Sequence, residues 1–94
     1  MITKFVYINL IINILKKKDT LYENYQIEYL KTKEFQITYL NNKYNMKVIQ
    51  EKKEFYLYLE PYHNSYFKTK INIQDLKMKL NMTLFAVKEN EEVY

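Results

Sequence analysis

Four short runs of this chain alternate apolar and polar residues with a period of two, at 35–39, 44–48, 55–59 and 67–71. Successive side chains of a β-strand point to opposite faces, so this pattern predicts strands with one buried face. Turn residues separate the runs, and we expect an antiparallel sheet that is buried on one side and wet on the other. The side chains expected to face inward are Phe35, Ile37, Tyr39, Tyr44, Met46, Val48, Phe55, Leu57, Leu59, Phe67 and Ile71.

A fifth run shows the same alternation near the C-terminal end of the sequence. Its apolar positions, which are also expected to face inward, are Met78, Leu80, Met82 and Leu84. We interpret residues 77–87 as a strand. Because unpaired edge strands offer free backbone groups to another chain, this strand is also a candidate edge or dimer seam.

The turns between these runs have to be made without glycine, because the chain contains none. Asn tolerates positive φ angles better than most residues, and we expect it to take the positions that Gly usually occupies. A turn is predicted at Asn41–Asn42 and another at Lys52–Lys53. Pro61 is expected to end the third strand, with residues 62–65 in a loop.

The N-terminal stretch 2–15 is rich in apolar residues and is followed by three lysines. Asn9, Asn13 and Lys16 follow one another at spacings of four and three, which is typical of a narrow polar stripe on a helix. The stretch is too short for a membrane span of about 20 residues, and a core helix is the favoured interpretation. A membrane-surface anchor and a buried strand are the alternatives.

Thr20 and Glu23 have the spacing of a capping box, which predicts a second helix at 20–32. Alternation at Tyr25, Ile27 and Tyr29 competes with this interpretation. The predicted fold is therefore α+β, with one or two N-terminal helices packed on an antiparallel sheet of four to five strands. A single domain, 1–94, is divided into a mainly helical part (1–33), antiparallel strands (34–88) and an acidic flexible tail (89–94).

The residues from which familiar active sites are built are scarce in this chain. It has no Cys, no Gly and no Arg, and its one His and one Ser are His63 and Ser65. A catalytic triad needs a third group and an oxyanion hole, and zinc sites need spaced Cys or His ligands. Phosphate-binding loops need Gly. We therefore predict no enzymatic activity, no catalytic residues, no metal site and no cofactor. The absence of Cys favours a reducing compartment, and a cytoplasmic location is expected.

The net positive charge of the chain suggests an acidic partner, but this inference is weaker than the magnitude of the charge implies. The net charge is +4 and the pI about 9.1. However, Lys, Asn, Ile, Tyr and Phe, all with A/T-rich codons, make up 51 of the 94 residues. An AT-rich genome therefore explains part of the lysine content. The lack of Arg further weakens the case for nucleic acid, because Arg is the side chain that reads phosphate and guanine through two hydrogen bonds.

The outward face of the predicted sheet is the best candidate for a binding surface. Tyr rings interleaved with Lys can contact another protein, with large contact area at small entropic cost. They can also stack bases and neutralise phosphates. The predicted surface consists of Tyr56, Tyr58, Tyr66, Lys68, Lys70, Lys77 and Lys79.

Three functional classes follow from this composition and this surface. The leading one is a small non-enzymatic protein-binding module, an inhibitor encoded by a virus or mobile element that blocks a host nucleic-acid-processing or defence complex. The first alternative is a single-stranded nucleic-acid-binding sheet. The second is an oligomerising structural subunit that forms a homodimer through an edge strand. A membrane partner is not expected.

Overall fold

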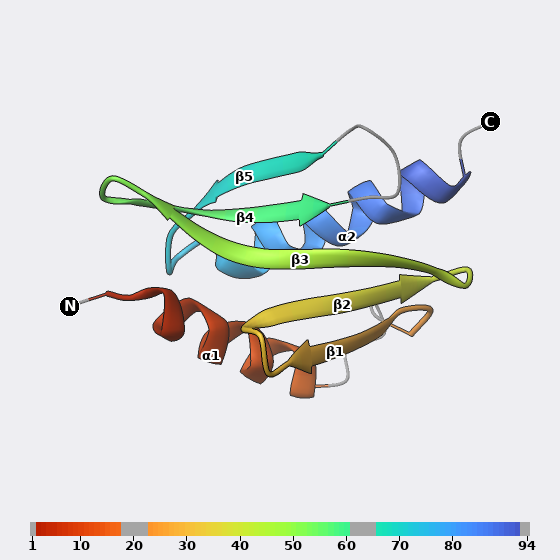
Figure 1. Ribbon diagram of the computed structural model, residues 1–94, viewed down its shortest axis with the longest axis horizontal. Coiled ribbons are helices and arrows are strands. Elements are labelled where there is room, and N and C mark those ends of the chain that lie inside the picture. The colour runs from red at the N-terminus through yellow and green to blue at the C-terminus, as the bar shows by residue number, and fades with distance from the viewer. Residues whose placement is uncertain (1, 18–22, 61–65, 93–94) are drawn as a thin grey trace.

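The computed structural model describes residues 2–17, 23–60 and 66–92. In these ranges, two helices flank five strands. Their order is α1 (Lys4–Lys16), β1 (Gln26–Leu30), β2 (Glu34–Tyr39), β3 (Asn42–Glu51), β4 (Glu54–Glu60), β5 (Phe67–Ile71) and α2 (Leu76–Glu92) (Figure 1). The α+β fold class predicted from the sequence is confirmed.

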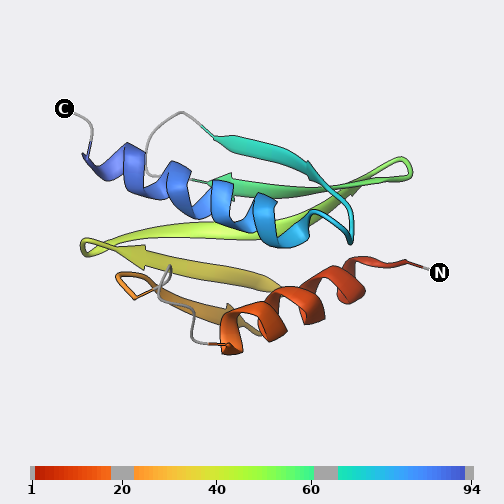
Figure 2. The same ribbon diagram turned by 180° about the vertical axis from the view of Figure 1, so that it is seen from behind.

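The five strands form one antiparallel meander in which each strand pairs with the next along the chain. Both helices lie against the same face of this sheet, behind it in Figure 1 and in front of it in Figure 2. The register places Phe35 opposite Met46, and Met46 opposite Leu59, so one apolar row crosses the three central strands. Neither of the described helices lies on the opposite face of the sheet (Figure 1), and we call it the outer face.

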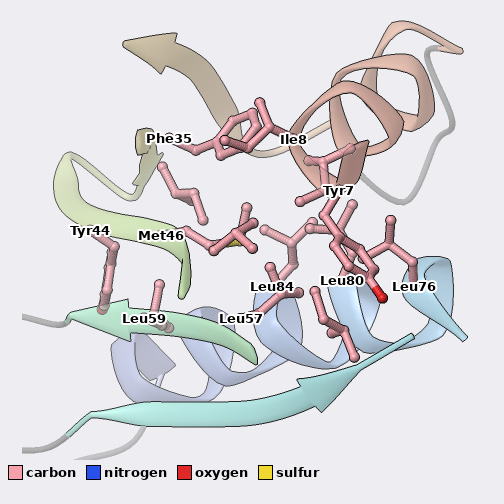
Figure 3. Close-up of a cluster of buried hydrophobic side chains, with 14 of the residues drawn as sticks. Tyr7, Ile8, Phe35, Tyr44, Met46, Leu57, Leu59, Leu76, Leu80 and Leu84 are labelled. Atoms are coloured by element: carbon pink, nitrogen blue, oxygen red, sulfur yellow. The ribbon is translucent and has the colours of Figure 1, made fainter. Parts of the chain in front are cut away.

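The core fills the space between the sheet and the helices. Twelve of the fifteen side chains predicted to face inward are buried, Phe67 is partly buried, and Met78 and Met82 are exposed. In Figure 3, Ile8 of α1 lies near Phe35, and Leu80 and Leu84 of α2 lie near Leu57. Each fully buried side chain of this size contributes roughly 2 kcal/mol through removal of apolar surface from water.

The N-terminal stretch is the core helix that its polar stripe predicts. Tyr7, Ile8 and Ile11 are buried under the sheet. Asn9, Asn13 and Lys16 are exposed, as expected for a polar stripe on the opposite side. α1 is therefore amphipathic and packs over β1, β2 and β3 (Figure 2).

The predicted second helix at 20–32 is wrong, because Gln26–Leu30 forms β1. Thr20 of the expected capping box lies outside the described residues. The competing alternation is the pattern that matters here: Ile27 pairs with Ile37, and the ring of Tyr29 lies 5.2 Å from that of Phe35. These cross-strand contacts favour a strand over a local helix start signal.

The predicted strand at 77–87 is also wrong, because these residues belong to α2. A helix turns by about 100° per residue, so alternate residues lie about 200° apart, on nearly opposite sides. Leu80 and Leu84 are buried, whereas Met78 and Met82 are exposed. The alternation therefore reflects two apolar sides of one helix, and residues 77–87 do not form the edge strand on which the expected dimer seam depended.

The glycine-free turns are made differently from the prediction. Within the described ranges, four residues have positive φ, namely Lys33, Leu40, Asn41 and Lys52, and one of these four is an Asn. The turn at residues 52–53 is confirmed, and the turn predicted at 41–42 falls one residue earlier, with Asn42 already in β3. The loop predicted at 62–65, with His63 and Ser65, lies outside the described residues, as does Pro61.

Candidate protein-binding surfaces

Five of the seven residues predicted to form the binding surface lie together on the outer face. Tyr56 and Tyr58 are on β4, and Lys68 and Lys70 are opposite them on β5. Tyr66 immediately precedes β5 and is 65% exposed. Its ring stacks on that of Tyr58, with the ring centroids 5.6 Å apart. The sheet register therefore builds the Tyr/Lys cluster that the alternation predicts.

Lys77 and Lys79 do not belong to this cluster, which corrects the prediction. Both lie on α2, on the opposite side of the sheet. The Nζ atom of Lys79 is 3.4 Å from Oγ1 of Thr69, a side chain that points toward the helices. The error follows from taking 77–87 as a strand, because the helix places these lysines in a different layer.

The lysines of the outer face are neutralised by carboxylates of the same face. Lys68 pairs with Glu51, Lys70 with Glu54 at 3.1 Å, and Lys47 of β3 with Glu60 at 2.9 Å. The sequence analysis did not anticipate these pairs, because they depend on the register of three strands. Each of these three lysines therefore has a carboxylate beside it that offsets its charge.

Aromatic rings reinforce this network. The ammonium group of Lys68 lies 4.5 Å from the ring centroid of Tyr56, and that of Lys47 lies 5.5 Å from Tyr58. The Tyr56 hydroxyl donates a 2.7 Å hydrogen bond to Glu54. This bond and the ion pair with Lys70 lower the pKa of the Glu54 carboxyl, and the same bond raises the pKa of Tyr56. The groups of the outer face are thus engaged with one another.

A second surface, which the sequence analysis missed, lies on the exposed side of α2. Met78, Met82 and Phe85 are 54%, 44% and 56% exposed. Their spacing of four and three places them on one side of the helix, directly opposite the buried Leu76, Leu80 and Val87. We call these three residues the α2 stripe. A helix that is apolar on two opposite sides has more apolar surface than its own fold buries.

The α2 stripe borders a groove of about 850 Å³ between the helix and β5. Two other hollows measure about 180 and 600 Å³. Phe67 of β5 and Ala86 of α2 form part of the apolar lining of the 850 Å³ groove, which also includes Lys77 and Glu89. The lining therefore combines apolar side chains with a cation near the start of α2 and an anion near its end.

Two sequence signals reveal this helix and its stripe. Asn72 and Asp75 form a reciprocal cap, in which each side chain accepts a 3.0 Å hydrogen bond from the backbone amide of the other. The spacing Leu76, Leu80, Leu84 continues at helical period beyond this cap. Residues 76–86 also contain one β-branched residue, Thr83, and are otherwise rich in helix-forming Lys, Leu and Met.

The second half of α2 is held on the sheet by three tyrosines, and residues 89–92, the described part of the predicted acidic tail 89–94, belong to this helix. The Tyr39 hydroxyl donates a 2.8 Å hydrogen bond to Glu92, and the Tyr44 hydroxyl donates to Glu91. Residues 93–94 lie outside the described residues. We call this arrangement, with Tyr25, the tyrosine clasp.

Tyr25 completes the clasp from the start of β1. Its hydroxyl donates a 2.8 Å hydrogen bond to the backbone oxygen of Leu84, and its ring lies 4.7 Å from that of Tyr39. Burial, with the charge of Glu92 as a smaller cause, raises the pKa of Tyr25 to about 12. The clasp is thus a structural anchor that fixes the orientation of α2 and of its exposed stripe.

Within 2–17, 23–60 and 66–92, no three His, Asp or Glu side chains gather in a way that would hold a metal ion. Neither helix in these ranges has the length and apolar character needed to cross a bilayer. Comparison of the chain with protein-family models, with curated proteins and with solved structures found no match.

Proposed function

We propose that this chain is a non-enzymatic protein-binding module and that it docks its partner through the α2 stripe. The observation that carries the proposal is the exposure of Met78, Met82 and Phe85, each about half accessible to water. Covering the exposed half of such a side chain contributes roughly 1 kcal/mol. Contiguous apolar side chains beside a groove are typical of sites where proteins meet. The flexible thioether side chains of Met adapt readily to a partner's surface.

The shape of the groove favours an amphipathic helix as the bound element. Such a helix lays its apolar side into a groove through anchors at spacings of three and four residues. The charges at the two ends add a requirement, since an acidic group suits the Lys77 end and a basic group suits the Glu89 end. An inhibitor that occupies a site on another protein is the narrower form of this proposal, and its support is the codon-skewed composition.

The alternative function, single-stranded nucleic-acid binding by the sheet, has less support from the structure than from the sequence. Lys47, Lys68 and Lys70 each have a carboxylate within ion-pair distance on the outer face. Phosphates would have to displace these carboxylates before they could release counterions and gain affinity. A titration of a labelled single-stranded oligonucleotide at several salt concentrations tests this, and we expect binding no tighter than that of an unrelated basic protein.

Site-specific photocrosslinking in the native cell tests the proposed docking surface. A benzophenone amino acid is placed at position 82 of the α2 stripe and, as the matched control, at position 56 of the outer face. We expect one discrete protein adduct from position 82, reduced when Phe85→Glu is added, and none from position 56. Adducts from position 56 alone, or no adduct from either position, would contradict the proposal.

A further inference from the structure

We propose that the partner of the α2 stripe is a second copy of this chain, bound with its own α2 antiparallel across a two-fold axis. This inference rests on the proposed function and names the occupant of the same site. It follows from comparing what the groove requires, an amphipathic helix with an acidic and a basic end, with what the chain itself presents. α2 carries an exposed apolar stripe with Lys77 near its start and Glu89 near its end.

The charges of α2 are complementary to themselves only when the two helices run in opposite directions. Lys77 and Glu89 are each six residues from Thr83, so they lie at equal distances, about 9 Å along the axis, from the middle of the groove. An antiparallel pair centred there places each Lys77 next to Glu89 of the partner subunit. A parallel pair would place like charges together at both ends, which is unfavourable.

The apolar side chains fit the same arrangement. With the helices antiparallel and centred at Thr83, Met78 lies about 4.5 Å along the axis from Phe85 of the partner subunit, less than one helical turn, and the two Met82 side chains lie close to the two-fold axis. A two-fold interface uses the same patch on both subunits, so a stripe of this kind is completed by a second copy and closes after two. The result is an apolar centre with a charge pair at each end, as in protein interfaces with a polar rim.

The surroundings of α2 leave room for this contact. The groove is lined by α2, by the turn before it and by Phe67 of β5, so α1 does not obstruct it. The side of α2 that points away from the sheet faces the viewer in Figure 2. Two copies would therefore stack their helix layers, with their sheets on the far sides and both outer faces open.

The area available predicts a dimer of modest affinity. A standard interface buries about 800 Å² on each partner, about an eighth of the 6627 Å² accessible surface of this chain. The three stripe residues supply part of that area, and the polar lining residues Gln74 and Asn81 have to supply more. We therefore expect a dissociation constant in the micromolar range.

Sedimentation equilibrium of the full chain over a wide concentration range tests the inference. The monomer mass is 11.7 kDa, and we expect the mass to double as concentration rises. Lys77→Glu and Glu89→Lys alone should each raise the dissociation constant about tenfold, since each creates two like-charge contacts. The double variant restores both pairs with reversed polarity and should return the constant to within about threefold of the original.

Two controls separate this outcome from changes in folding. Lys31→Glu, in the turn between β1 and β2, makes the same charge change far from α2 and should leave the dissociation constant unchanged. Circular dichroism and thermal unfolding show whether each variant is folded. Met82→Glu should abolish the dimer in a folded protein, and a dimer that survives this substitution would overturn the inference.

The remaining outcomes distinguish this inference from the proposed function. A chain that is monomeric at all concentrations, while position 82 still crosslinks to a protein of another mass, overturns the self-association and leaves the docking surface intact. A monomer without any adduct from position 82 overturns both. A dimer in which the double charge reversal does not rescue the single variants overturns the antiparallel arrangement.

Discussion

The outer face and the α2 stripe are both exposed and both rich in large side chains, yet they differ in what they leave unsatisfied. On the outer face, Lys70 forms an ion pair with Glu54, and the ring of Tyr66 stacks on the ring of Tyr58. On the α2 stripe, Met78, Met82 and Phe85 are half exposed to water. A surface whose groups are already engaged with one another gains little from a partner, because each new contact replaces an old one.

The difference has a structural origin. The outer face belongs to a sheet, where pairing of strands aligns residues of opposite charge from β3, β4 and β5. The α2 stripe lies on one side of a single helix, directly opposite the buried Leu76, Leu80 and Val87. Exposure alone is therefore a poor guide to a binding surface, and the state of engagement of the exposed groups is a better one.

The largest expected effect distinguishes the two sides of α2. Leu80→Ala should lower the free energy of unfolding by about 3 kcal/mol, because it leaves a cavity in the core. Met82→Ala, two residues away on the stripe, should change it by less than about 0.5 kcal/mol. Urea unfolding measures both. A large loss from Met82→Ala would mean that the stripe is part of the core, and the comparison with the outer face would fail.

A smaller effect separates tyrosines of the clasp from those of the outer face. Tyr44→Phe removes the hydroxyl that donates to Glu91 and accepts a 2.9 Å hydrogen bond from Asn90, at a residue that is 1% exposed. We expect a loss of about 1.5 kcal/mol in urea unfolding. Tyr58→Phe, the matched change on the outer face, should have little effect. Equal losses would show that the clasp does not anchor α2.

Ion pairing on the outer face should produce a still smaller change in stability. Lys70→Glu places two carboxylates together at Glu54 and should lower the urea midpoint slightly, since exposed pairs contribute little. The additional substitution Glu54→Lys should restore the midpoint by re-forming the pair with opposite polarity. If the double variant is no more stable than the single one, the pair does not exist in solution, and the outer face would be free to bind a partner.

The smallest effect is a dependence of stability on pH. The pKa of Glu54 is lowered in the folded state, so its contribution is present above the ordinary value of 4.5 and is lost as pH falls through the folded value. The pKa of Lys70 is raised above 10.5, mainly by its bond to Glu54, so that contribution is lost only as pH rises through the higher folded value. Urea unfolding midpoints measured from acid to strong base should therefore fall in acid, where the Glu54 contribution to stability is lost, and in strong base, where the Lys70 contribution is lost. Lys70→Met should remove part of both trends.

Secondary structure was predicted correctly from the sequence where a residue pattern is compatible with only one kind of element. The strands around Phe35, Tyr44, Phe55 and Ile71 were predicted because each has alternation on one buried face. α1 was predicted because Asn9 and Asn13 mark its exposed side. Prediction failed at α2 because a helix with two apolar sides repeats every second residue, as a strand does. Helix-forming composition and the Asn72–Asp75 cap are the signals that separate the two.

The candidate surfaces were predicted less completely, and for a different reason. The alternation placed Tyr56 and Lys68 on the outer face, but it gave no information on register between strands. Register is what brings Glu51 to Lys68 and neutralises the face. The α2 stripe was missed because its methionines were assigned to the core of a sheet. Charge pairing and helix orientation both require contacts between segments distant in sequence, which periodicity alone does not contain.

The tyrosine clasp and the buried side of α2 also have a consequence for synthesis on the ribosome. The meander allows each strand to pair with its predecessor as the nascent chain emerges, because all of its contacts are between neighbours. The apolar face of β4 and β5, with Leu57 and Ile71, stays uncovered until α2 follows. During that interval the nascent chain exposes a sheet that chaperones can recognise and that can aggregate. The emergence of α2 from the ribosome is therefore the step that covers this apolar face and protects the chain from misassembly.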